Sequence, residues 1–128
     1  MIRVIIFLAL SILCNQANAI IKCEKLYQVV TTESSGKYKA LVRQYFSNDN
    51  RVSKIYVQNV MKYGDWFIIN ASTDVTDPAF FFFKNNTYID IWDGVIFPEE
   101  KNKTLKWTQQ KKMPQNLAEC FIDSITIK

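Results

Sequence analysis

The sequence contains no histidine, and only three glycines and three cysteines among its 128 residues. Without histidine, neither a Ser-His-Asp triad nor a Cys-His pair can form, and the usual imidazole metal ligands are missing. The glycines Gly36, Gly64 and Gly94 stand far apart, whereas a loop that cradles phosphate needs several of them close together. These absences make an enzyme the less favoured interpretation, and we expect no cofactor.

Long hydrophobic runs are also missing, apart from one at the start that is shorter than the ~20 residues of a membrane span. A basic start precedes this run at residues 4–13, and Ala17 and Ala19 then frame a small-x-small cleavage triplet. This layout is typical of a secretory signal peptide at residues 1–19, followed by a single mature domain at residues 20–128. The alternative is a buried N-terminal helix. We expect export to the periplasm or the extracellular space, with no membrane span in the mature chain.

Two cysteines, Cys23 and Cys120, remain in the mature chain, because Cys14 lies within the expected leader. In an oxidising compartment an even pair of this kind predicts a disulfide, and two inert buried thiols are the alternative. A metal site is not expected, since two thiolates without histidine supply half of a zinc shell. The net charge of +4 becomes +3 when the expected leader, which contains Arg3, is removed. So small a charge gives no reason to expect nucleic-acid binding.

Hydrophobic spacing predicts helices in the first part of the mature chain. Residues 20–30 and residues 40–46 each carry a stripe of helical period, and Ser34-Ser35-Gly36 is expected to interrupt the two. The first stripe is equally compatible with a strand.

From residue 52 on, the pattern changes to strands separated by turn residues. The predicted strands are residues 52–63, 66–72, 79–84 and 87–93. Gly64 and the pair Asn85-Asn86 tolerate the positive φ of tight turns. A polar, lysine-rich stretch at residues 98–112 and a short helix or turn at residues 116–121 follow. This order predicts an α+β fold, with helices on one face of a curved four-stranded antiparallel meander.

Four consecutive phenylalanines at residues 80–83 do not alternate with polar residues, as a half-exposed strand would. A two-residue turn at Asn85-Asn86 sets Phe83 opposite Tyr88, and unbroken pairing continues from there. The face toward the helix is then predicted to hold Phe80, Phe82, Ile89 and Ile91. The other face is predicted to gather the candidate binding residues Phe81, Phe83, Tyr88 and Trp92 around the carboxylate of Asp90.

Four aromatic side chains on a face expected to contact solvent must be covered by other groups. The cover is either the lysine-rich segment with Leu105 and Trp107, or a protein partner or second copy of the chain, or the ligand of a concave pocket. The lysines of residues 99–112 form either a solvated loop or a basic rim that steers an acidic partner. Asp65 and Asp93 lie at strand ends, where aspartate is common in turns, so we assign no catalytic residue.

Several short motifs resemble a group of small exported bacterial proteins of unknown function. The matching residues are Gly64 and Trp66, residues 80–83, residues 88–94 and residues 114–120. The resemblance covers roughly the C-terminal two thirds of the mature chain and departs from the group's pattern where no cysteine follows Gly94. It implies no activity. The helix-and-meander layout is similar to that of cystatin-like and NTF2-like domains, a similarity of fold only.

The sequence therefore predicts an exported binding protein of the inhibitor or immunity type, which contacts a protein partner through the aromatic sheet face. The alternative is an NTF2-like small-molecule carrier or enzyme, in which Asp90 and Tyr88 line a pocket between helix and sheet.

Overall fold

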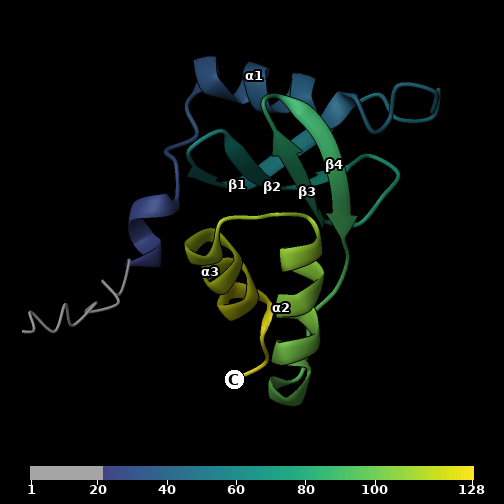
Figure 1. Ribbon diagram of the computed structural model, residues 1–128. Helices are drawn as coiled ribbons and strands as arrows, with labels where there is room; N and C mark the ends of the chain where they lie inside the picture. Colours follow the sequence, from purple (N-terminus) through teal and green to yellow (C-terminus); the bar gives the residue numbers. More distant parts are fainter. Residues whose placement is uncertain (1–21) are drawn as a thin grey trace, which may run out of the picture.

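The computed structural model describes residues 22–128, so the expected leader at residues 1–19 lies outside the described residues. Four strands form an antiparallel sheet in the order β1-β2-β3-β4 (Figure 1). The strands are β1 (Ile55–Tyr63), β2 (Trp66–Thr73), β3 (Ala79–Lys84) and β4 (Thr87–Trp92). The α-helices are α1 (Thr32–Arg43), α2 (Lys101–Gln110) and α3 (Gln115–Ile125), with 3-10 turns at Cys23–Leu26 and Pro98–Glu100. The predicted α+β class is confirmed.

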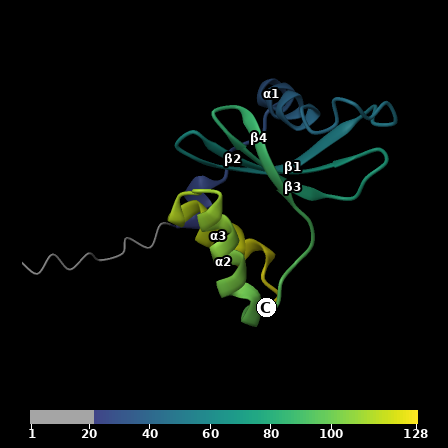
Figure 2. The same cartoon turned by 45° about the vertical axis from the view of Figure 1, so that its right-hand side comes forward.

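Helices cover both faces of the sheet, whereas the sequence predicted helices on one face. Figure 2 shows α1 on one side of the sheet and α2 and α3 on the other. Two separate hydrophobic clusters result, one on each side. The cluster beneath α1 contains Leu41, Val42, Phe67, Ile69, Phe81 and Phe83. The cluster against α2 and α3 contains Trp66, Ile68, Phe82, Leu117, Phe121 and Ile125. A continuous aromatic strand such as β3 is what a sheet covered on both faces requires.

The stretch Ser34-Ser35-Gly36 lies near the beginning of α1 and does not interrupt the helix. The hydroxyl of Thr31 accepts a hydrogen bond from the Ser34 N–H at 3.1 Å, and the Ser34 hydroxyl accepts one from the Thr31 N–H at 2.8 Å. This reciprocal cap satisfies amides that the first turn would otherwise leave without partners. The helix therefore begins at Thr32 and ends at Arg43.

The hairpin turns have the predicted conformation. Gly64 has a φ of 58°, and Asn85 and Asn86 have φ values of 51° and 60°. Both central residues have positive φ in the Asn85-Asn86 turn, and only the first has it in the Gly64-Asp65 turn. Both geometries match the twist of the flanking strands in a two-residue hairpin. Phe83 pairs with Tyr88, as the turn predicts.

The pairing beyond Tyr88 differs from the prediction by one residue. Phe82 lies opposite Asp90, and Phe80 lies opposite Trp92, because the register shifts after Phe83. This β-bulge inserts Ile89 as an extra residue and exchanges the faces of the residues that follow. Trp92 consequently shares the α2 and α3 side with Phe80 and Phe82, whereas it was predicted to lie with Phe81 and Phe83. Ile91 shares the α1 side with Phe81 and Phe83, whereas it was predicted to lie with Phe80 and Phe82.

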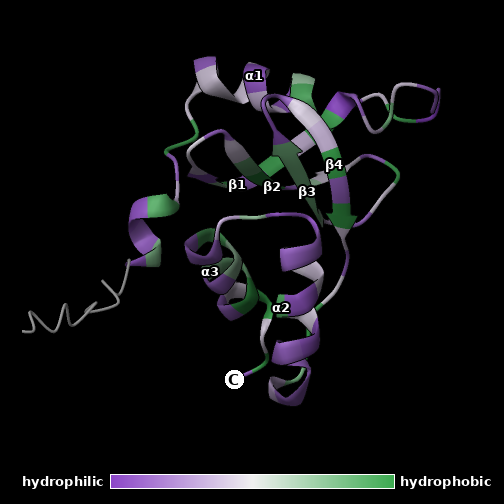
Figure 3. Cartoon of the chain, in the orientation of Figure 1, coloured by the Kyte–Doolittle hydropathy of each residue, from purple (hydrophilic) through white to green (hydrophobic). Residues whose placement is uncertain are grey.

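The lysine-rich stretch forms a 3-10 turn and helix α2 rather than a loop. Thr104 and Thr108 are its buried residues, and each hydroxyl donates to a backbone carbonyl of the same helix, of Glu100 and Leu105 respectively. These internal bonds let threonine occupy a buried helix face at little cost in desolvation. The helix therefore looks hydrophilic along most of its length in Figure 3, although one side of it packs against α3.

A disulfide joins Cys23 to Cys120, as predicted. The bond ties the 3-10 turn at Cys23–Leu26 to α3, across a sequence separation of 97 residues. After this turn, Tyr27 forms an isolated antiparallel bridge with Met61, so the N-terminal segment is also fastened to the outer edge of β1.

Candidate functional site

The five residues predicted to form a binding face do not share a face. Phe81 and Phe83 are buried beneath α1, with exposed fractions of 2% and 0%. Trp92 lies on the opposite side, with its ring 5.1 Å from that of Trp107. The prediction failed because the bulge in β4 exchanged the faces and because α1, not a partner, covers β3. Phe83 is therefore closed to a partner or to a second copy of the chain, and Phe81 exposes only 2% of its surface.

The two polar members of that set have partners within the chain. Asp90 forms an ion pair with Lys111 at 2.8 Å, which ties the C-terminal end of α2 to β4. Tyr88 packs beside Tyr45, and burial raises the pKa of its phenol above the ordinary 10.0, with further contributions from the charge on Asp90 and from Tyr45. Asp90 and Tyr88 therefore contact other parts of the same chain, Lys111 and Tyr45 respectively.

An open groove of about 650 Å³ lies at one end of the sheet and is the site to which the structure points. Three segments meet there because strands in a meander alternate in direction: the connection before β1, the connection between β2 and β3, and the end of β4. Its floor is apolar, formed by Phe46, Ala79, Phe81 and Ile91. Its walls carry Tyr45, Asn48, Asp49, Arg51, Thr76, Asp77 and Asp93.

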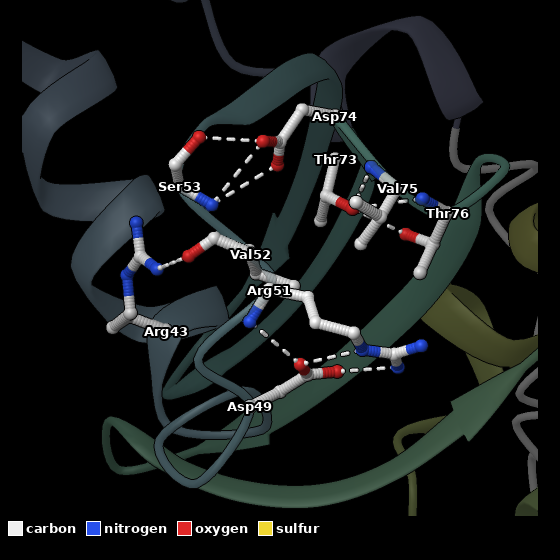
Figure 4. Close-up of polar contacts among 9 residues, drawn as sticks. All are labelled: Arg43, Asp49, Arg51, Val52, Ser53, Thr73, Asp74, Val75 and Thr76. Atoms are coloured by element: carbon white, nitrogen blue, oxygen red, sulfur yellow. Dashed lines mark hydrogen bonds and ion pairs between the residues drawn. The ribbon is translucent and has the colours of Figure 1, made fainter.

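Hydrogen bonds fasten the connection before β1 on one side of the groove (Figure 4). The Arg43 guanidinium donates to the carbonyl of Val52 at 3.0 Å. Arg51 makes a two-pronged ion pair with Asp49, at 3.1 and 3.0 Å, and hydrogen bonds from its side chain and backbone lower the pKa of Asp49. Bidentate pairs of this kind hold a side chain in one geometry. This wall is preformed.

The connection between β2 and β3 is fastened to the same wall by Asp74. Its carboxylate accepts hydrogen bonds from the hydroxyl and the backbone N–H of Ser53 (Figure 4). The backbone N–H of Lys54 donates to the same carboxylate. These bonds favour the charged form and lower the pKa of Asp74 from 3.8 to about 2. Within the same loop, the Thr73 hydroxyl accepts from the N–H groups of Val75 and Thr76. Asp74 is therefore the link between two of the three segments that form the groove.

Replacing Asp74 with asparagine should lower the thermal midpoint at neutral pH and have a vanishing effect in acid. The folded pKa lies below the ordinary value, so the carboxylate stabilises the fold above pH 3.8 and loses that contribution as the pH falls toward 2. Thermal unfolding of both proteins across this range measures the difference. Asp77→Asn is the control, because no hydrogen bond or ion pair of Asp77 occurs in the described part of the chain. A constant difference between wild type and Asp74→Asn down to pH 2 would contradict this role.

Of the predicted site residues only Phe81 lines the groove, as part of its buried floor. Asn48, Asp49, Thr76 and Asp77 were missed because residues 47–50 and 74–78 were interpreted as polar breaks between elements, and Asp93 was assigned to a turn. The predicted meander already places the start of the first strand, the second connection and the end of the fourth strand at one end of the sheet. Polar and charged residues recurring in those three places were the signal that sequence reasoning could have used.

Comparison of the chain with protein-family models, with curated proteins and with solved structures returns no match. Among residues 22–128, none of the helices has the length and apolar character needed to cross a membrane. The same part of the chain holds no cluster of three or more cysteine, aspartate or glutamate side chains arranged to bind a metal ion.

Proposed function

We propose that this protein is an exported binding protein that accepts a side chain of a protein partner in the groove at the end of its sheet. The observation that carries the proposal is the groove itself, which has an apolar floor, a polar rim and walls held by hydrogen bonds. A surface that is already ordered loses little conformational entropy when a partner binds. The bonded Cys23–Cys120 pair is compatible with an oxidising compartment and so with export.

The lining supplies contact groups and no nucleophile beside a base, which favours binding over catalysis. The Thr76 hydroxyl already shares a hydrogen bond with Thr73 at 2.8 Å. Tyr45 stands at the rim with 45% of its surface exposed, while its ring contacts Phe46 and Phe81. A partly exposed, well-supported aromatic side chain is the type of residue that dominates binding energy at protein interfaces.

The volume of the groove also falls within the range of small-molecule sites, which keeps the carrier alternative as a second candidate. Neither Asp90 nor Tyr88, the residues expected to line such a pocket, reaches this groove. Exposed rim residues such as Asn48 and Thr76 leave it open, an arrangement that suits a protruding side chain of a partner better than an enclosed small molecule.

Selection of a random displayed-peptide library on residues 20–128 tests the proposal. We expect the selected peptides to lose about tenfold or more in affinity for Tyr45→Ala, because the aromatic contact at the rim of the groove is removed. Tyr56→Ala is the matched control: Tyr56 is exposed to a similar extent, 48%, but lies on β1 outside the groove. Asn48→Arg narrows the groove without removing a packed ring and should weaken binding as well.

Two outcomes would overturn the proposal. One is a selection that yields no binding peptide, and the other is a set of peptides that bind Tyr45→Ala and Asn48→Arg as tightly as the wild type. Thermal unfolding of each variant shows whether a loss of binding arises from unfolding.

A further inference from the structure

We infer that the side chain accepted by the groove is that of an arginine, an inference that rests on the proposed function. The groove combines a carboxylate-rich rim with an apolar and aromatic interior, and these features match the guanidinium and the aliphatic stem of arginine.

The rim is acidic although the protein as a whole is basic. Three carboxylates, those of Asp49, Asp77 and Asp93, line the groove together with one cation, Arg51, whereas the whole chain carries a formal charge of +4. Arg51 is already paired with Asp49. Within residues 22–128, no ion pair or side-chain hydrogen bond engages Asp77 or Asp93. The groove therefore presents two carboxylates that a partner's cation would neutralise, and no lysine of the chain lines it.

The floor explains why the ligand is a side chain with an aliphatic stem and not a small inorganic cation. Ala79 and Phe81 are 8% and 2% exposed, and with Ile91 they form an apolar surface between the acidic walls. A bare metal ion gains nothing from such a surface and prefers a shell of oxygen ligands. Long cationic side chains bury their methylene groups against apolar surface while the charged end reaches polar partners.

The aromatic rim favours arginine over lysine. Tyr45 lies at the edge of the floor with its ring 5.4 Å from the ring of Phe81, and 45% of the residue is exposed to solvent. The guanidinium stacks on aromatic faces and presents several donors in a plane, so it can contact Tyr45 and a carboxylate together. Lysine offers a single strongly hydrated charge. We therefore expect arginine to bind more tightly than lysine in the same peptide.

Short acetylated, amidated peptides that differ only at the central position test the inference. The probes carry arginine, lysine, citrulline or norleucine between alanines, and their binding is followed through the amide resonances of Ala79 and Ile91. Citrulline keeps the shape of arginine without its charge. We expect the arginine peptide to bind about tenfold or more tightly than the citrulline peptide. The affinity of the arginine peptide should fall with added salt, whereas that of the uncharged citrulline and norleucine peptides should not.

Paired variants show whether the rim carboxylates cause this preference. Asp77→Asn combined with Asp93→Asn should abolish the advantage of arginine over citrulline while leaving the norleucine peptide unaffected. Asp65→Asn combined with Glu33→Gln removes the same charge from exposed positions outside the groove and should leave the preference intact.

Failure of the inference and failure of the proposed function give different results. If the citrulline or norleucine peptide shifts the groove resonances as strongly as the arginine peptide, the inference is wrong and binding in the groove stands. If lysine binds best, the cation requirement stands and arginine is the wrong residue. If none of these probes shifts the groove resonances and the displayed library yields no groove-binding peptide, both are wrong.

Discussion

Phe82→Ala and Phe83→Ala should each lower the free energy of unfolding by about 3–5 kcal/mol, the usual cost of emptying a buried phenylalanine site. Adjacent residues of a strand point to opposite faces of the sheet. If one face were exposed to solvent, only one of the two substitutions would cause a large loss of unfolding free energy. Here the rings are 1% and 0% exposed, because α3 covers the first and α1 covers the second. Urea unfolding of the two variants measures both costs.

Phe97→Ala is the matched control for these substitutions. It removes the same atoms from a ring that is 56% exposed, in the segment between β4 and α2. A cost for Phe83→Ala as small as that for Phe97→Ala would contradict the packing of β3 beneath α1. It would also restore the aromatic sheet face as a candidate docking surface.

Removing the disulfide by Cys23→Ala together with Cys120→Ala should cost about 2–5 kcal/mol of unfolding free energy. The bond closes a loop with a sequence separation of 97 residues. In the chain-entropy account, a loop of this length constrains the unfolded state by about 4–5 kcal/mol, and measured effects are often smaller. The urea midpoint of the wild type should fall when a reductant is added, while the midpoint of the double variant should not change.

Thiol labelling of residues 20–128 complements the urea experiment. Denatured, unreduced protein should contain no free cysteine, because Cys23 and Cys120 are bonded to each other. Two labelled thiols, or a urea midpoint unaffected by reductant, would falsify the disulfide as a stabilising link between the N-terminal segment and α3.

The groove and the disulfide occupy different parts of the molecule. Cys23 and Cys120 border a separate hollow that also contains Tyr27 and Asp123, and none of these residues lines the groove. We therefore expect loss of the disulfide to lower stability without removing the preference for arginine, provided that binding is measured where the variant remains folded.

Local chemistry in the sequence determined the fold class, both hairpin turns and the cysteine pairing. Gly64 and Asn85-Asn86 can adopt positive φ at small cost, so the turns could be placed from residue type alone. The strands could be located because β-branched and aromatic residues cluster between these turns. The disulfide was predicted from the two cysteines that lie outside the expected leader.

Tertiary structure decided the bulge at Ile89, the burial of both sheet faces and the assembly of the groove. A bulge leaves no reliable trace in the hydrophobic pattern of β4, yet it moves Trp92 to the other side of the sheet. Helix α2 was not predicted from the sequence because its buried residues are threonines and not apolar residues. Their hydroxyls donate hydrogen bonds to backbone carbonyls of Glu100 and Leu105. The groove joins residues 45–51, 76–81 and 91–93. Residues so far apart in sequence meet only because the strands pair, and local propensity carries no information about that proximity.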